Sequence, residues 1–545
     1  MTLSAATPLP VNPLPSSTVT PVPTPFSSPT PAATFTPTPL PQGGHVIEAG
    51  LAKISTLNPL LIPADEDLSR AIGGLLFEGL LRVDAQSAAL TPGLARAWEI
   101  SEDLQTLTFH LREDVTWHDG EPFEATDVTF TLAAAGNPEG ESPYRFDLAD
   151  IIQVRSPDDA TVIVTFDEPS CDALYAVGQV PIVPWHLLEG QDLAQGTFNQ
   201  RPVGTGPFVF ASWRADGELV LDANRDYWDG RPYLDSWTYR VVPDARTLQK
   251  DLAQGRAHLA RLPVDPRNKA LPDTVHLISY PADQWYFLAL NNDHPILGDP
   301  AVRQALALAL DRERLLEESL DGQGASIESP WLATHWALDG DSPAPLAYAP
   351  DQARQILDEA GWRDIDGDGL LSKDGQRLHV AISTNLGNPV RERIAILAQQ
   401  YWRAVGISAQ VEVLPWGVFM NDLFEHTFDT AVFDWPLEAA PDQTWLWATA
   451  ENAIGTGFNF ISYTNVQVDA LLEQGRTAQG CDTERRAAAY PALAQHLAID
   501  RPYIFLFVPH RHLAVSRTLV GLQPGAYSEL YWNATEWYLA EEEKQ

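Results

Sequence analysis

Hydrophobic and polar positions follow two periods along the chain, and they predict strands and helices from about His45 onward. Apolar residues at every second position predict strands, and apolar residues three or four apart predict helices. In the first half of the chain this pattern predicts strands at 45–50, 105–111, 161–166, 207–222, 236–242 and 257–262, and helices at 68–81 and 123–134.

After the apolar stretch at 284–292, helices alternate with strands. Asp299 and Pro300 supply an N-cap and a first-turn proline for the next helix. Helices are predicted at 301–320, 350–360, 390–404, 416–426, 466–478 and 482–499, and strands at 377–384, 408–414, 429–435 and 503–511. Alternation of this kind predicts an α/β protein with helices packed on mixed β-sheets.

The chain length and the first 42 residues define its organisation. A chain of 545 residues is too long for one hydrophobic core, so two or three domains or lobes are expected. Residues 1–42 are mostly Pro, Thr and Ser, which predicts a disordered, extended tether. The first 20 residues lack the basic and apolar regions of a signal peptide, and no stretch of eighteen apolar residues predicts a membrane span.

Charge and cysteine content exclude several classes of protein. The net charge of -38 argues against binding to nucleic acid or to an anionic membrane surface, both of which require basic residues. Cys171 and Cys481 lie outside any zinc-binding spacing. They can pair in an oxidising compartment, but their separation in the sequence favours two unpaired thiols.

Three groups of residues are candidates for catalysis or metal binding. His118, Asp119 and Asp127 lie in a His- and Asp-rich run over 107–134, where no nucleophile is spaced to act with a base. Residues 364–369 match the first half of a calcium loop, but position 12 is Gly375, so an acidic turn competes with a calcium site over 364–375. His510 and His512 form a second candidate pair. We expect no catalytic residue, no cofactor and no bound metal.

Several motifs resemble one known family, the extracellular solute-binding proteins of ABC importers in the peptide/nickel-binding class (family 5). The run from Leu111 to Val128, "LREDVTWHDGEPFEATDV", is similar to that family's signature. The resemblance continues, in the same order, through "PVGTGPF" at 202–208, "NRDYWDG" at 224–230, "DPAVRQA" at 299–305 and "YW" at 401–402. It covers about residues 45–545, so the His- and Asp-rich run is interpreted as scaffold.

The family implies a fold, a function and a location. The expected fold is a two-lobed α/β periplasmic-binding-protein clamp (type II, large peptide-binding class) with mixed β-sheets and an extra subdomain in lobe I. Lobe I would comprise 43–280 and 508–545, with its subdomain at about 86–200, and lobe II would comprise 281–507. The expected protein is a non-enzymatic, monomeric extracellular or periplasmic lipoprotein that delivers a peptide to the permease subunits of an ABC transporter.

The resemblance also carries over residues that would bind the ligand. In peptide-binding members, an Asp three residues after a strand Trp holds the ligand's ammonium group; here these positions are Glu438 and Trp435, with Asp434 and Leu437 beside them. Glu438 is either that cation-binding group or a solvated loop carboxylate. Arg391 and Arg393 either face a ligand carboxylate or are exposed. Trp285 and Trp416 are candidates for stacking on the ligand.

Other ligands and one other class of protein stay open at this point. Pro436 removes a backbone donor, and the following loop is short, which departs from the peptide-binding pattern. An oligosaccharide, an opine-like amine or a nickel chelate are the alternative ligands. A secreted hydrolase is the alternative class, and no motif supports it.

Overall fold

The computed structural model describes residues 41–214, 217–262, 271–338 and 340–540. The described residues from 41 to 540 belong to one compact unit. The predicted tether therefore lies outside the described residues, apart from its last two positions. Within the described ranges, no helix is long and apolar enough to cross a membrane.

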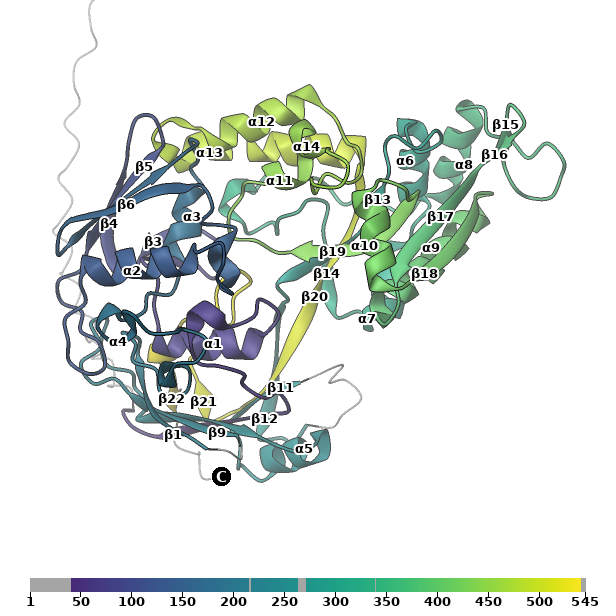
Figure 1. The fold of residues 1–545 in the computed structure, drawn as a ribbon. Coiled ribbons are helices and arrows are strands. Elements are labelled where there is room, and N and C mark those ends of the chain that lie inside the picture. The colour runs from purple at the N-terminus through teal and green to yellow at the C-terminus, as the bar shows by residue number, and fades with distance from the viewer. Residues whose placement is uncertain (1–40, 215–216, 263–270, 339, 541–545) are drawn as a thin grey trace, which may run out of the picture. The chain divides into compact units, whose positions relative to one another are not determined.

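Twelve of the described strands form one mixed sheet (Figure 1). The strand order is β18 (Ser408–Leu414), β17 (His379–Asn385), β19 (Thr430–Pro436), β13 (Gln284–Leu290), β20 (Tyr503–Ser516), β11 (Leu259–Leu262), β1 (His45–Gly50), β10 (Ser236–Val241), β9 (Glu218–Ala223) and β8 (Phe208–Trp213), with β12 (Val275–Pro281) and β14 (Gly324–Ser326) also paired to β20. β17 is parallel to β18 and β19, and β1 is parallel to β10 and β11, whereas β13 and β20 are antiparallel to their neighbours.

β20 belongs to both halves of this sheet, and Figure 1 shows it running from β13 and β14 to β11 and β12. Its residues 503–507 pair with β13, and its residues 510–516 pair with β12. β12 and β13 are separated by only two residues, Ala282 and Asp283. The chain therefore passes between the two halves of the sheet along two neighbouring segments, the β12–β13 junction and the middle of β20.

Helices cover the half of the sheet that contains β17, β18 and β19. They are α6 (Pro300–Leu308), α7 (Arg312–Leu320), α8 (Pro350–Glu359), α9 (Pro389–Ala404), α10 (Trp416–Phe424), α11 (Thr444–Trp447), α12 (Val466–Arg476), α13 (Thr483–Ala487) and α14 (Tyr490–Asp500). Asp299 accepts a hydrogen bond from the amide of Ala301 (2.9 Å), and Asn388 accepts one from the amide of Arg391 (3.1 Å), so a polar cap and a proline begin both α6 and α9.

A separate four-stranded antiparallel sheet borders the run that resembles the family signature. In its two central strands, β5 (Thr106–Leu111) and β7 (Thr161–Phe166), buried positions alternate with half-buried ones, as the period of two predicts. The elements here are β4 (Ala95–Ile100), β5 (Thr106–Leu111), β7 (Thr161–Phe166) and β6 (Ile151–Asp158), with α2 (Ala125–Ala135), α3 (Ala173–Gly178) and α4 (Trp185–Leu188). Elsewhere lie α1 (Asp67–Leu76), α5 (Ala245–Ala253), β2 (Leu81–Val83), β3 (Leu90–Pro92), β15 (Ser372–Lys373), β16 (Gln376–Arg377), β21 (Leu519–Val520) and β22 (Tyr538–Leu539).

The His- and Asp-rich run holds neighbouring segments together. Asp127 accepts hydrogen bonds from the indole of Trp117 (3.1 Å) and from the amide of Glu124 (3.0 Å). His118 accepts a hydrogen bond from the amide of Gly204 through Nδ1 (3.2 Å), and its Nε2 donates to the carbonyl of Gly206 (3.0 Å). Burial lowers the pKa of His118 to about 4, so the imidazole is neutral at pH 7. This part of the run is scaffold, as the sequence predicted.

Several predicted elements have different bounds in the structure. The helix predicted at 68–81 ends at Leu76, whose carbonyl accepts the amide of Gly206 (2.9 Å) instead of continuing the helix. The helix predicted at 301–320 divides into α6 and α7 because Asp311 caps a new helix. The helix predicted at 482–499 divides because Pro491 lies in the first turn of α14. The strand region at 207–222 is the hairpin β8–β9.

The preference for unpaired thiols was wrong. Cys171 and Cys481 form a disulfide between positions 310 residues apart in the sequence. Cys171 precedes α3, and Cys481 lies between α12 and α13. Only the folded chain brings these two segments together, and spacing along the sequence carried no signal for it.

Candidate ligand-binding site

The carboxyl ends of β17, β18 and β19 lie at one edge of the sheet, because β17 is parallel to both neighbours. α9 begins just after β17, α10 begins just after β18, and residues 437–439 follow β19. This edge carries most of the side chains that the sequence predicted for ligand binding. In open α/β sheets, the carboxyl edge of the parallel strands is also the usual place for a ligand.

Trp435 lies in an aromatic cluster on one face of β19. It is paired with Trp285 across the sheet, and its ring contacts those of Phe287 and Trp445, with centroids 6.1 and 5.1 Å apart. Its indole donates to the hydroxyl of Tyr503 (3.2 Å). Trp435 is 9% exposed and Trp285 is 1% exposed, so both contribute more to the core than to an open surface.

Asp434 points to the other face of β19, as strand alternation requires. Its carboxylate pairs with the guanidinium of Arg391 at 2.6 Å, and both side chains are largely buried. Arg391 also donates to the side chain of Asn385 (2.6 Å), and its guanidinium carbon lies 4.4 Å from the centroid of the Phe433 ring. The guanidinium of Arg391 is therefore surrounded by the carboxylate of Asp434, the side-chain amide of Asn385 and the ring of Phe433.

Arg393 and Trp416 occupy more open positions near this edge. Arg393 forms an ion pair with Glu318 of α7, on the side of α9 away from Asp434. Trp416 begins α10 and is 53% exposed, with its ring centroid 6.1 Å from that of Phe433. The structure thus brings Arg391, Asp434 and Trp416 together and places Arg393 elsewhere.

A cavity of about 650 Å³ lies beside the residues that follow β19. Leu437 and Ala439 contribute to its wall, and the amide of Leu437 donates to the carbonyl of Asp283 (2.8 Å). The other wall includes Tyr144, part of α1 and the segment 525–533. The volume is in the range of small-molecule binding sites.

A ring of charges that the sequence did not predict lines this cavity. Arg70 of α1 contacts Asp67 (3.0 Å) and Asp283 (3.3 Å), and Arg511 of β20 contacts the same two carboxylates at 2.5 and 2.6 Å. Glu529 lies 3.4 Å from Arg70. The ring joins α1 to both segments that connect the halves of the main sheet. No motif in the sequence marks these residues, and only the fold brings them together.

Glu438 lies between the two cavity residues Leu437 and Ala439 and is half-buried. The side-chain amide of Gln443 donates to its carboxylate at 3.3 Å. Burial raises the pKa of Glu438 to about 8, and the nearby negative charges of Asp147, Asp442 and Asp172 add to this effect. A carboxylate in such surroundings is stabilised by a cation, so this position suits a ligand's ammonium group.

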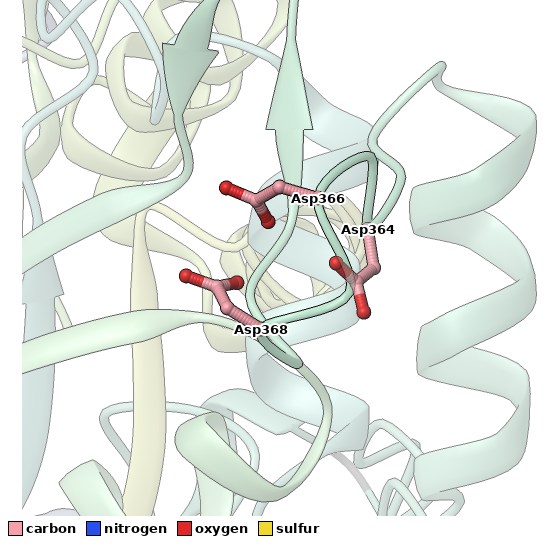
Figure 2. Close-up of side chains that lie close together, drawn as sticks. All are labelled: Asp364, Asp366 and Asp368. Atoms are coloured by element: carbon pink, nitrogen blue, oxygen red, sulfur yellow. The ribbon is translucent and has the colours of Figure 1, made fainter.

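The acidic turn is the one group among the described residues that offers three metal-ligand side chains together, Asp364, Asp366 and Asp368 (Figure 2). Their ligand atoms lie within 4.8 Å of one another. Arg377 donates to Asp368 (2.6 Å) and to Asp366 (3.2 Å), while Asp364 accepts the amides of Gly367 and Gly369. A guanidinium thus neutralises two of the three carboxylates, and the turn lies away from the cavity wall.

His510 and His512 lie in the part of β20 that pairs with β12. The ring of His512 is hydrogen-bonded to the hydroxyl of Ser279 (2.9 Å), and burial lowers the pKa of His510. Both imidazoles are therefore part of the strand packing around the crossing point.

Comparison with known proteins is consistent with this geometry. The α/β fold with its mixed sheet is that of the periplasmic binding proteins: the solved structure of oligopeptide-binding protein AppA of Bacillus subtilis in complex with a nonapeptide matches with a TM-score of 0.67, 28% identity, 92% coverage of this chain and 100% of that chain. A model of the bacterial extracellular solute-binding proteins, family 5 Middle, matches residues 89–456. The chain belongs to this family.

Individual relatives extend over most of the chain. The sequence of AppA of Bacillus subtilis (strain 168) is 29% identical over 513 residues, covering 92% of both proteins. Protein XP55 of Streptomyces lividans is 33% identical over 470 residues, with 85% of this chain and 83% of that protein covered. The structure of NikZ of Campylobacter jejuni with Ni(L-His) matches with a TM-score of 0.67, 27% identity, and 90% and 99% coverage. The predicted family and fold are confirmed, and the family is one of binding proteins, not of enzymes.

Proposed function

We propose that this protein is the substrate-binding component of an ABC transporter and that it captures a peptide for delivery to a membrane permease. The observation that carries the proposal is Glu438, a half-buried carboxylate between two residues of the cavity wall, three residues after Trp435. The likeness to AppA, which is named as an oligopeptide-binding protein, supports a peptide over the alternative ligands.

The proposed clamp has lobe I at 43–280 and 508–545, with a subdomain at about 86–200, and lobe II at 281–507. The support is the course of the main sheet: the chain crosses between its halves at the β12–β13 junction and in the middle of β20. The cavity takes residues from both proposed lobes, because α1 lies in the first and Leu437 in the second. Closure of the lobes on a ligand would strip water from both.

Glu438 and Arg391 have different roles in the proposed site. Glu438 would accept the ligand's ammonium group, and closure would strengthen this charge-assisted hydrogen bond by excluding water. Arg391 is already paired with Asp434, so we propose that it orders the sheet edge and leaves Trp416 exposed to the ligand. Trp435 supports the segment that carries Glu438.

We also propose an extracellular or periplasmic location in which residues 1–42 tether the protein to a lipid anchor. The Pro- and Thr-rich composition of this segment supports an extended spacer. Fractionation of native cells should place the protein with the membrane, from which detergent releases it and salt does not.

Calorimetry on the variant Glu438→Gln tests the proposed function. Gln keeps the shape and the hydrogen-bonding capacity but removes the charge, so affinity for a mixture of short peptides should fall about 10–100-fold, as expected for a charged hydrogen bond of roughly 1.5–3 kcal/mol. N-acetylated peptides should bind wild type and variant equally weakly. Glu359→Gln, the same change on an exposed position of α8, is the control and should leave affinity unchanged.

The variant Trp435→Ala separates peptide from sugar. Loss of the ring should weaken binding of either ligand, because Trp435 supports the segment after β19. A neutral oligosaccharide would tolerate Glu438→Gln and still lose affinity with Trp435→Ala. Unchanged peptide affinity in both variants would contradict the assignment of this site.

A further inference from the structure

The disulfide between Cys171 and Cys481 connects segments that belong to different lobes of the proposed clamp. Cys171 precedes α3 in the subdomain of lobe I, and Cys481 lies between α12 and α13 in lobe II. It is therefore a third covalent connection between the lobes, in addition to the β12–β13 junction and the middle of β20. The inference below rests on the two-lobed clamp proposed above.

Polar contacts surround the disulfide and connect the same two segments. The amide of Cys171 donates to the carbonyl of Arg476 (2.9 Å). Next to it, Asp172 forms a buried ion pair with Arg486 (2.6 Å), and the Nε of Arg486 donates to the carbonyl of Gly475 (2.9 Å). These polar contacts hold the backbone around Cys171 against lobe II independently of the covalent bond.

The contact continues away from the disulfide. The indole of Trp336 donates to the hydroxyl of Tyr175 (2.9 Å), which itself donates to the carbonyl of Ala88 (2.9 Å). The amide of Trp336 donates to the carbonyl of Ser87 (2.8 Å), and Ala88 is buried in the same hydrophobic cluster as Trp331. This surface, formed by residues 87–88 and 171–175 on one side and 331–336 and 475–486 on the other, is called the latch surface below.

The position of the latch surface limits how the lobes can move. The two strand crossings are adjacent, because Tyr280 pairs with Arg511 and Pro281 pairs with His510, so together they act as a single hinge. With only this hinge, lobe II is free to swing in more than one direction. A second fixed point at the Cys171–Cys481 disulfide allows the lobes only one rotation relative to each other, about the line that joins the hinge to the disulfide.

We propose that the Cys171–Cys481 disulfide is a redox-controlled restraint on the clamp. While the bond is intact it confines the lobes to that single rotation, and its reduction allows the latch surface to separate and the lobes to open wider. Restricting the open ensemble favours the closed, ligand-holding state. The oxidised protein therefore exchanges ligand more slowly than the reduced protein.

The redox step requires a dithiol as co-reactant. Cys171 is fully buried, while Cys481 is half-buried, so a thiolate of the dithiol attacks the sulfur of Cys481. The Cys171 thiolate leaves and takes up a proton. The second thiol of the reagent then displaces Cys481, so that one disulfide and one dithiol become two protein thiols and one oxidised reagent, a transfer of two electrons.

Hydrogen exchange on ligand-free protein tests this proposal. Wild type reduced with dithiothreitol and the double variant Cys171→Ser/Cys481→Ser should both lose protection about tenfold or more at two amides of lobe II. The amide of Trp336 donates to the carbonyl of Ser87 across the latch surface, and the amide of Leu332 donates to the hydroxyl of Tyr527 in lobe I. Amides of β13 and β19, in the main sheet, should keep their protection. Equal loss at both places would show that the bond serves only overall stability and would overturn the proposal, as would unchanged protection at the latch surface.

The variant Arg486→Gln distinguishes the covalent restraint from the contacts around it. Arg486→Gln removes the ion pair with Asp172 but keeps the disulfide, so its oxidised form should keep the latch surface protected and its reduced form should lose protection further than reduced wild type. If oxidised Arg486→Gln opens as far as reduced wild type, the disulfide is not the restraint. Because no ligand is used, this result is independent of the ligand-binding test of the proposed function.

Discussion

At the scale of single residues, surroundings decide what an ionisable side chain does. His118 lies in the most suggestive run of the sequence, yet it is neutral and hydrogen-bonded between backbone groups of the scaffold. Glu438 lies in an inconspicuous loop, yet burial and neighbouring carboxylates raise its pKa to about 8. The raised pKa means that the ionised form of Glu438 is poorly stabilised in the ligand-free protein, and a ligand's ammonium group would stabilise it.

This raised pKa predicts how the stability of the ligand-free protein depends on pH. An ordinary Glu has a pKa near 4.5, so between about 4.5 and 8 the folded protein holds a proton at Glu438 that the unfolded chain has released. The free energy of unfolding should therefore fall as pH rises through this window. The pKa of Asp442, raised to about 6 by burial, acts in the same direction at lower pH.

Glu438→Gln isolates the contribution of this one carboxyl. Urea unfolding followed by tryptophan fluorescence at pH 5 and pH 8 should show that wild type loses more stability than the variant over this interval. A parallel pH dependence of the two proteins would mean that Glu438 is solvated and ionised at neutral pH, which would remove its role as a cation site.

At the scale of elements, α9 shows how two residues of one type receive different roles. Arg391 faces the sheet and pairs with Asp434, while Arg393, two positions later, points to α7 and Glu318. Helical geometry separates the two side chains by about 200°, so one helix turn cannot aim both at the same ligand. Which of the two arginines faces the sheet could not be predicted without knowing which face of the helix is buried.

The two arginines predict a matched pair of stability measurements. Arg391→Met leaves the buried Asp434 without its partner and should destabilise the protein by about 3–5 kcal/mol. Arg393→Met removes a more exposed ion pair and should change stability by about 0–1 kcal/mol. Equal effects of the two changes in urea unfolding would contradict the placement of Arg391 in the sheet edge.

Much of the secondary structure followed from the sequence, and the exceptions have local causes. The strand at 408–414 and the helix at 390–404 were predicted within one residue, and so was the start of α6. Helix ends were wrong where another segment uses the last carbonyl, as at Leu76, or where Pro491 starts a new helix. Local patterns do not contain these tertiary contacts.

At the scale of the whole molecule, the family could be predicted from ordered motifs, but the contacts between distant segments could not. The charge ring of Arg70, Arg511, Asp67 and Asp283 joins residues more than 400 positions apart, and the disulfide joins positions 310 residues apart. Both lie where the proposed lobes meet. Ligand capture and movement of the lobes would therefore be coupled at the junction between the lobes.

Native mass spectrometry shows directly whether this protein captures peptides, when it is purified without denaturation from cells grown in peptide-rich medium. We expect a bound state whose added mass, after release and fragmentation, resolves into short peptides with free N-termini, and Glu438→Gln should lose this bound state. Release of a sugar, an amine conjugate or a metal chelate from wild-type protein, with no peptide, would contradict the claim.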